Sequence, residues 1–333
     1  MTIWNRMTPH NSGFRYLGLY ETILYICMIG FALNQNHKKF IKTYKGSHFK
    51  TYEPKLKYKS KINKIIVFDL DETLGQFTEL YVIYKCLVKV LDREITQAEF
   101  NRLLDLFPEF LRPGILNVLK ILYQSKIEGV FSRLFLYTNN QCVGNWVRYI
   151  IHYFHYKIGA LTTPLFEDPI CAFKIRNKIV NIRRTSQDKS YSDLIHCAVF
   201  PPSTTEVCFI DNTYYEHMRD DRVYYILPKS YHHALKKMEI MRRLNDFDES
   251  MFNLYDKMAG MLGNSLSENT YEKTPRETEM YITKKIMYHV REFLYFGCDD
   301  GYFYNIKTTG KTVVNRIGCA KAVRRTRKKM DFV

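Results

Sequence analysis

A short apolar run that ends in paired acids constrains the fold of this chain more than any other feature. Residues 64–69 read Lys-Ile-Ile-Val-Phe-Asp. An apolar, largely branched run of this length predicts a strand buried on both faces, which is typical of a parallel sheet. Asp69 and Asp71 stand where this strand ends. Because residues two apart on an extended chain point the same way, both carboxylates are expected to face one spot.

Strand and helix patterns alternate through the centre of the chain, which indicates an α/β fold with a parallel sheet. Thr96 is positioned to cap one of the helices, and Arg112-Pro113-Gly114 introduces another. Residues 160–184 predict loops or a hairpin. The expected helices cover residues 79–91, 97–107, 115–127, 141–156 and 190–197. Further buried strands are expected at residues 133–137, 206–210 and 223–227.

The sequence divides into four segments. Residues 1–60 predict an N-terminal extension, in which an apolar helix is followed by a Lys-rich stretch. Residues 61–231 predict the α/β domain. Residues 232–315 predict a helical appendage, Met-rich at 232–260 with a further helix at 277–295, and residues 316–333 form a basic tail without expected structure.

The formal charge of +16 is concentrated in two flanks. Residues 35–64 carry +9, residues 316–333 carry +6 and residues 1–34 carry +1, so that residues 65–315 are neutral overall. A domain that binds along a nucleic-acid backbone usually carries its basic residues across its folded binding surface. The flanks instead indicate tethers to RNA, a membrane surface, an acidic partner or an import receptor, or simply solvated tails. The run at 321–329 is typical of a nuclear import signal or an RNA-binding tail.

The N-terminal apolar stretch, residues 16–33, is interrupted by Glu21. It falls just short of the ~20 residues of an ordinary transmembrane helix, so a packed helix is favoured over a membrane anchor. No small-residue cleavage site follows it, which argues against a signal peptide. The 8 cysteines form no Cys-x-x-Cys pair and are expected to be reduced thiols. These features indicate an intracellular protein, with cytoplasm and nucleus left open.

The paired acids suggest that the two carboxyl groups have different chemical roles. Two carboxylates this close raise the pKa of one of them unless a neighbouring charge neutralises the other. A magnesium ion on Asp69 would keep it ionised as a nucleophile, while Asp71 could hold a proton as general acid and base. Cleavage of a phosphate ester requires these two roles. The alternative is a surface loop of acids that caps a helix.

The segment Val67-Phe68-Asp69-Leu70-Asp71-Glu72-Thr73-Leu74 resembles the signature of haloacid dehalogenase (HAD) phosphatases. With Arg112-Pro113-Gly114, it is similar to the branch that dephosphorylates the RNA polymerase II C-terminal domain, also called NLI-interacting-factor-like phosphatases. The resemblance covers residues 64–228. It implies a Rossmann-like three-layer α/β/α domain and an aspartyl-phosphate intermediate.

The resemblance also implies a magnesium site and a phosphate site. Phosphate would be bound by Thr138, by the adjoining Asn139 and by Lys189. The metal residues would be Asp69, Asp71, Asp211 and Asn212, with Asn212 as a direct ligand and Asp211 orienting Lys189 or a metal-bound water. Thr213-Tyr214 departs from the Ser-Pro that is usual in this branch, which bears on the substrate-side loop more than on the metal.

The substrate expectation comes from residues 160–188, where this branch carries a substrate-selecting insertion. Basic residues in that stretch suit a phosphorylated or acidic protein, and the candidates for substrate contact are Lys174, Arg176, Arg183 and Arg184. The reaction expected is therefore protein phosphoserine or phosphothreonine hydrolysis. Two alternatives stay open: a phosphatase for nucleotides or nucleic-acid ends, which the basic flanks favour, and a binding protein with a degenerate site.

Overall fold

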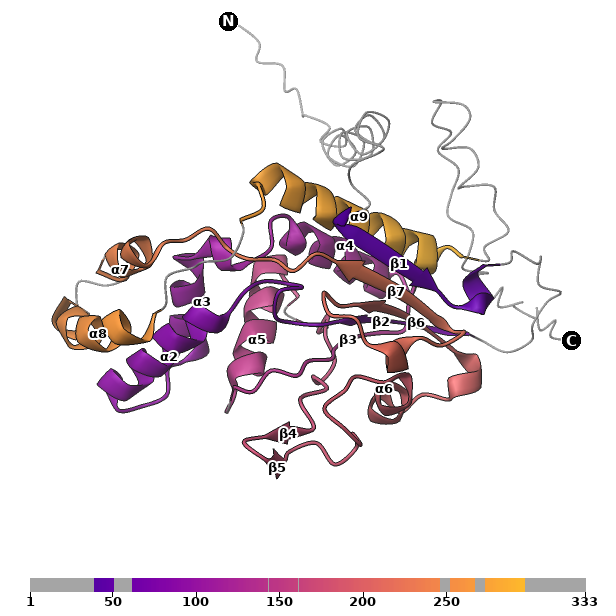
Figure 1. Cartoon of the computed structure of the whole chain (residues 1–333), viewed down its shortest axis with the longest axis horizontal. Coiled ribbons are helices and arrows are strands. Elements are labelled where there is room, and N and C mark those ends of the chain that lie inside the picture. Colours follow the sequence, from indigo (N-terminus) through magenta and orange to yellow (C-terminus); the bar gives the residue numbers. More distant parts are fainter. Residues whose placement is uncertain are drawn as a thin grey trace, which may run out of the picture.

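A five-stranded sheet forms the centre of the computed structural model, which describes residues 39–50, 62–142, 144–160, 162–245, 252–266 and 273–296. The strand order is β1-β7-β6-β2-β3 (Figure 1). Strands β7, β6, β2 and β3 are parallel, and β1 pairs antiparallel with β7. The strands are β1 (Ile41–Lys45), β2 (Asn63–Phe68), β3 (Arg133–Leu136), β6 (Thr205–Ile210) and β7 (Val223–Pro228). The expected α/β fold with a mostly parallel sheet is confirmed.

Strand β1 is the part of the sheet that the hydrophobic pattern does not predict. It lies in the Lys-rich stretch assigned to the N-terminal extension, and it pairs from Ile41 opposite Pro228 to Lys45 opposite Tyr224. Its sequence, Ile-Lys-Thr-Tyr-Lys, is only partly buried. Lysines on an edge strand discourage pairing with other chains, so a short, charged strand suits this position although its pattern is weak.

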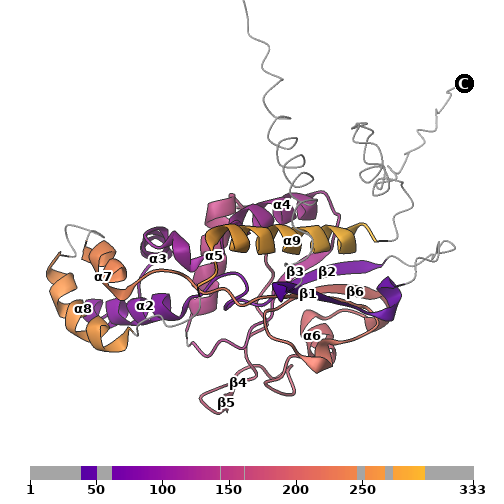
Figure 2. The same cartoon turned by 45° about the horizontal axis from the view of Figure 1, so that its top comes forward.

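Helices cover both faces of the sheet, because alternate residues of each buried strand point to opposite sides. Ile66 and Phe68 of β2 belong to a core shared with α4 (Ile115–Ile127), α5 (Trp146–Ile158) and α9 (Arg276–Leu294). Ile65 and Val67 face the opposite core, where α6 (Tyr191–Ala198) packs. Figure 2 shows α4 and α9 on one side of the sheet and α6 on the other.

The remaining helices gather at one end of the sheet (Figure 1). They are α2 (Thr78–Leu91), α3 (Gln97–Asp105), α7 (Lys237–Asn245) and α8 (Phe252–Ser265), and α8 packs along α2. The expected appendage is thus divided between two places: α7 and α8 join this helical group, whereas α9 contacts β6 and β7. Helix α8 ends at Ser265, beyond the Met-rich helical stretch expected at 232–260. Single 3-10 turns occur at residues 47–49, 108–110, 202–204 and 216–218.

Two local expectations have different outcomes. Of the loops or hairpin expected within 160–184, the structure has a hairpin, because β4 (Lys174–Ile175) and β5 (Lys178–Ile179) pair through Arg176 and Asn177. Both turn residues have left-handed φ angles of 48° and 63°, as a tight two-residue hairpin requires. The helix expected at 141–156 was placed wrongly at its start. It begins at Trp146 because Asn140 holds a loop: its Oδ1 accepts the N–H of Cys142 at 2.8 Å.

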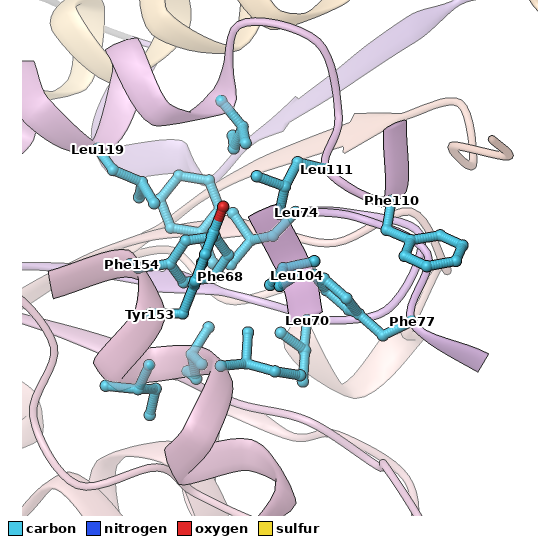
Figure 3. Close-up of a cluster of buried hydrophobic side chains, with 14 of the residues drawn as sticks. Phe68, Leu70, Leu74, Phe77, Leu104, Phe110, Leu111, Leu119, Tyr153 and Phe154 are labelled. Atoms are coloured by element: carbon cyan, nitrogen blue, oxygen red, sulfur yellow. The ribbon is translucent and has the colours of Figure 1, made fainter. Parts of the chain in front are cut away.

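Apolar residues of the acidic segment are anchored in the larger core. Phe68, Leu70 and Leu74 are fully buried, and Figure 3 shows them among residues of the helical group and of α5, including Leu104 and Phe154. Since Leu70 stands between Asp69 and Asp71, its burial turns both acids away from the core.

Several expectations concern residues outside the described ranges: the apolar stretch at 16–33, the import-like run at 321–329 and the basic tail at 316–333. Within the ranges that the structure describes, no helix is long and apolar enough to cross a membrane.

The cap of α3 provides a test of the fold. Thr96 and Glu99 form a reciprocal capping box, in which the Thr96 hydroxyl accepts the Glu99 N–H at 3.2 Å and Glu99 accepts the Thr96 N–H at 2.7 Å. We expect Thr96→Ala to lower the free energy of unfolding by about 1 kcal/mol, measured by urea denaturation. Thr163→Ala, at an exposed loop threonine, is the control and should change it by less than about 0.5 kcal/mol. Equal effects of the two substitutions would contradict the cap.

Candidate active site

Asp69 and Asp71 lie in a tight loop at the carboxyl end of β2. The N–H of Asp69 continues the ladder by donating to Ile210 O at 2.8 Å. Glu72 then adopts a left-handed φ of 60°, and its N–H donates to Gly75 O at 2.6 Å. Gly75 has to be a glycine, because a Cβ there would stand 2.4 Å from Phe110 O. This loop therefore reverses directly after the strand and keeps both acids at the edge where ligands bind in parallel sheets.

Lys189 connects Asp69 to the neighbouring strand. Its ammonium lies 2.5 Å from Asp69 Oδ1 and 2.7 Å from Oδ2 of Asp211, which follows β6. The three side chains are buried, with 1% of Lys189, 7% of Asp69 and 1% of Asp211 exposed. Burial lowers the pKa of Lys189, but the two carboxylates outweigh it and the net shift is upward, so the lysine stays charged. The three predicted residues thus form one charged cluster.

Asp71 is held by a residue that the sequence analysis did not assign. Asn140 Nδ2 donates to Asp71 Oδ2 at 2.7 Å. Removal from water raises the pKa of Asp71 to about 7, the Asn140 bond opposes that shift, and the nearby Asp69 charge adds to it. Asp71 nevertheless keeps part of its surface exposed. A carboxyl with this pKa can hold a proton near neutral pH and exchange it with solvent. Only the fold reveals Asn140, because an Asn in a loop has no distinctive pattern.

Thr138 and Asn139 follow β3, next to the acids. Thr138 is 1% exposed, and its hydroxyl accepts the Asn140 N–H at 3.0 Å, which leaves the hydroxyl proton able to donate. The Asn139 side chain is engaged within the protein: Nδ2 donates to Gln187 O and Oδ1 accepts from Arg184, both at 2.8 Å. Since α5 starts only at Trp146, Asn139 lies in a loop and not in the first turn of that helix.

Arg184 does not occupy the surface position that was expected of a substrate-binding residue. It is 2% exposed, and its guanidinium donates to carbonyls of the surrounding loops, at 3.1 Å to Cys171 O and 2.9 Å to Gln187 O. It also stacks over the Tyr137 ring, with 4.7 Å to the centroid. Its role is to hold the loop that carries Lys189. The other candidates remain near the surface, with Lys174 partly exposed and Arg176 and Arg183 exposed.

Asn212 is fixed by side chains from two segments. Its Oδ1 accepts from the Thr73 hydroxyl at 2.8 Å, and its Nδ2 donates to Ser230 Oγ at 3.0 Å and to Glu72 Oε2 at 3.2 Å. The backbone N–H of Asn212 donates to the same Thr73 hydroxyl at 3.1 Å. One lone pair of Oδ1 remains for a further partner. Thr73, Glu72 and Ser230 are therefore supports of the site that the motif analysis did not assign.

The donor chemistry around Asp69 suits a divalent cation, although no group of three or more His, Cys, Asp or Glu side chains is arranged as a metal site among the described residues. Lys189 engages Oδ1 of Asp69 and not Oδ2. Both oxygens of Asp211 already have a partner within the protein, because Oδ2 binds Lys189 and Oδ1 accepts the Thr213 N–H at 2.8 Å. Asp69, Asp71 and Asn212 remain as oxygen donors, which magnesium prefers.

Comparisons with protein-family models, curated proteins and solved structures find no match to this chain.

The Lys189 cluster predicts a large and pH-dependent loss of stability when the lysine is removed. Lys189→Met leaves Asp69 and Asp211 buried without their cation, which we expect to cost about 3–5 kcal/mol near neutral pH. Burial already raises the pKa of Asp211 to about 7. In the variant, the folded state therefore binds more protons than the unfolded state, and its stability should rise as the pH falls from about 8 to about 5.

The control is Lys157→Met, which removes a half-exposed ion pair with Asp105 (2.9 Å). It should cost no more than about 1 kcal/mol. Chemical denaturation at several pH values measures both variants, and a pH-independent loss in Lys189→Met would contradict the proposed charge cluster.

Proposed function

We propose that this protein is a magnesium-dependent phosphomonoester hydrolase of the HAD type. The observation that carries the proposal is the buried contact of Lys189 with both Asp69 and Asp211, beside a third acid, Asp71, whose pKa is raised to about 7. A mostly parallel sheet with helices on both faces supports a Rossmann-like three-layer domain of this type. Asp69 and Asp71 follow β2, Asp211 follows β6 and Thr138 follows β3. With Lys189, which binds Asp69, they lie at the carboxyl ends of the parallel strands, where such domains bind ligands.

The chemistry divides into two displacements at phosphorus. An Asp69 oxygen attacks the phosphorus atom, and the bond from phosphorus to the ester oxygen breaks. Asp71 gives its proton to that departing oxygen, and Asp69 becomes an aspartyl-phosphate. Asp71 then takes a proton from a water molecule as the water oxygen attacks phosphorus, which releases inorganic phosphate and restores Asp69.

Lys189 and the Thr138 hydroxyl would stabilise the charge of the transferring phosphoryl group. Asp211 keeps Lys189 in place, and Asn140 orients Asp71. Magnesium, held by Asp69, Asp71 and Asn212, would supply further positive charge to the phosphoryl oxygens. Because each positioning group is already hydrogen-bonded in place, little reorganisation is needed during the reaction.

A phosphorylated protein segment is the substrate class that the surface favours. The β4–β5 hairpin stands out from the sheet on the α6 side (Figure 2). Ile179, Val180 and Ile182 are exposed by 55%, 50% and 90%, beside the exposed cation Arg183 and the hairpin turn at Arg176. An apolar and cationic surface of this kind suits an extended peptide that carries phosphoserine or phosphothreonine. A nucleotide or nucleic-acid-end phosphatase is the second candidate, supported by the basic flanks alone.

The proposal predicts turnover that depends on Asp69 and on a divalent cation. The full-length protein should release phosphate from 4-nitrophenyl phosphate with magnesium, lose this activity with a chelator and regain it on addition of magnesium. Asp69→Asn should lower turnover by at least about 10³-fold, because it removes the nucleophile. The control is Asp92→Asn, at an exposed aspartate, which should keep the turnover of the original protein. Asp92 has a left-handed φ of 52°, a conformation that asparagine also adopts.

The same assay with phosphopeptides, nucleotides and 3′-phosphorylated oligonucleotides separates the substrate classes. Preference for the phosphopeptide would support the protein phosphatase, and preference for either nucleic-acid substrate would favour the second candidate. No turnover of any phosphoester in magnesium would overturn the proposal in favour of a binding protein with a degenerate site.

A second prediction concerns the proton that Asp71 provides. Asp71→Asn should slow hydrolysis of an alkyl phosphate such as phosphoserine by about 10²–10⁴-fold, because the alkoxide leaving group needs a proton. The nitrophenolate leaving group of 4-nitrophenyl phosphate needs no proton, so Asp71→Asn should still form the phosphoenzyme from this substrate. Rapid-mixing kinetics of the variant should therefore show a stoichiometric burst of nitrophenolate, followed by slow hydrolysis of the phosphoenzyme. A uniform loss with both substrates and no burst would contradict the role of Asp71.

A further inference from the structure

The Arg112-Pro113-Gly114 segment lies between the acidic loop and the C-terminal helix α9. All three residues contact α9: Arg112 Nη1 donates to Glu279 Oε2 at 2.9 Å, and Pro113 O accepts from the Thr283 hydroxyl at 2.8 Å. Gly114 has a left-handed φ of 82°, and a Cβ there would stand 3.2 Å from Met280 Sδ. The segment is therefore fitted to one face of α9, which carries residues 279, 280 and 283.

Arg112 also fixes the backbone of the acidic loop. Its guanidinium is 1% exposed and reaches three carbonyl groups in two chain segments. Nε donates to Thr73 O at 2.8 Å, and Nη2 donates to Glu72 O and to Lys229 O, both at 2.7 Å. The two segments are tied directly as well, because the N–H of Tyr231 donates to Glu72 O at 2.8 Å.

The residues fixed by Arg112 are the residues that hold Asn212. Glu72 and Thr73 bind the Asn212 side chain and have their own carbonyls bound by Arg112. Ser230 is the third residue whose side chain binds Asn212, and it directly follows Lys229, whose carbonyl is bound by Arg112. A single buried guanidinium therefore binds the main chain at Glu72 and Thr73 and at Lys229, next to Ser230, and Glu72, Thr73 and Ser230 hold the Asn212 amide.

Glu279 is what allows this guanidinium to be buried. A buried charge is costly unless an opposite charge and hydrogen bonds compensate it. The carbonyl groups accept three hydrogen bonds from Nε and Nη2 of Arg112, and Glu279, itself 2% exposed, accepts one from Nη1 and supplies the negative charge. Since Glu279 comes from α9, the geometry of the acidic loop depends on a helix more than 160 residues further along the chain.

From these contacts we infer that Arg112 and Glu279 are positioning residues for Asn212, so that α9 is a structural part of the cation site. The inference rests on the proposed function, in which Asn212 binds magnesium. Arg112 touches neither cation nor substrate. It acts through the carbonyls of residues 72, 73 and 229, and its removal should weaken cation binding while leaving the phosphoryl contacts of Lys189 and Thr138 in place.

The test uses the full chain and two variants of different severity. Arg112→Lys keeps a positive charge but cannot make all four contacts, and Glu279→Gln keeps an acceptor but removes the compensating charge. Mn²⁺ binding, followed by the electron paramagnetic resonance signal of the free ion, should weaken about 10-fold or more in both, as for other residues that orient metal ligands. The KM for 4-nitrophenyl phosphate at saturating cation should stay within about 2-fold of the original protein.

A second readout needs no metal. The backbone N–H groups of Asn212 and Tyr231 are bound to Thr73 and Glu72. Their hydrogen exchange in the metal-free protein should become at least about 10-fold faster in both variants, because the loop that holds them is released.

The control separates this role from general loosening of α9. Lys64 binds the other end of that helix, with Nζ donating to the carbonyls of Phe293, Leu294 and Phe296 at 2.9, 2.7 and 3.1 Å. Lys64→Met should lower the melting temperature, yet leave Mn²⁺ affinity and exchange at Asn212 unchanged. If Lys64→Met weakens Mn²⁺ binding as much as the Arg112 and Glu279 variants do, the positioning role is overturned.

The remaining outcomes distinguish the inference from the proposed function. If the unchanged protein binds Mn²⁺ and both variants bind it equally well, the inference is wrong and the proposed function stands. If the unchanged protein binds no Mn²⁺, the cation site and the proposed function fail together. Exchange at Asn212 and Tyr231 then still decides whether Arg112 and Glu279 position this residue.

Discussion

The buried contact of one ammonium with two carboxylates organises the centre of this protein. Lys189 comes from the loop before α6, Asp69 follows β2 and Asp211 follows β6. A lysine surrounded by the rings of Tyr137 and Phe209 would be unfavourable without these acids, and the acids would be equally unfavourable without the lysine. Their mutual compensation fixes the ends of two neighbouring strands relative to α6. The chemistry that we propose uses the same three groups.

Each proposed reactive group has a separate support in the structure. Asp71 is held by Asn140, Lys189 by its two acids, and Asn212 by a set of side chains that depends on Arg112. Arg184 holds the loop that leads to Lys189 from inside the protein. Supports of this kind keep polar groups in place in advance, which is what electrostatic stabilisation of a phosphoryl group requires.

Helix α9, the last element of the described residues, contributes to the domain rather than standing apart from it. Helix α9 covers β6 and β7, and its two ends are bound by Arg112 and by Lys64. The edge strand β1 and α9 also meet, because Lys45 pairs with Glu292. Segments on both sides of the expected catalytic domain therefore complete its sheet and its helical layer.

Local sequence was enough to predict the buried strands β2, β3, β6 and β7 and most helices, since an apolar run or a helical spacing reports burial of the residue itself. It also indicated that Asp69 and Asp71 share a face, because a two-residue spacing has that consequence on any strand. The pairing of β1, the burial of Arg184 and the contacts of Asn140 and Glu279 depend on partners elsewhere in the chain. Only the tertiary structure decides these features, because a charged or amide side chain has the same local pattern whether it is solvated or buried against a partner.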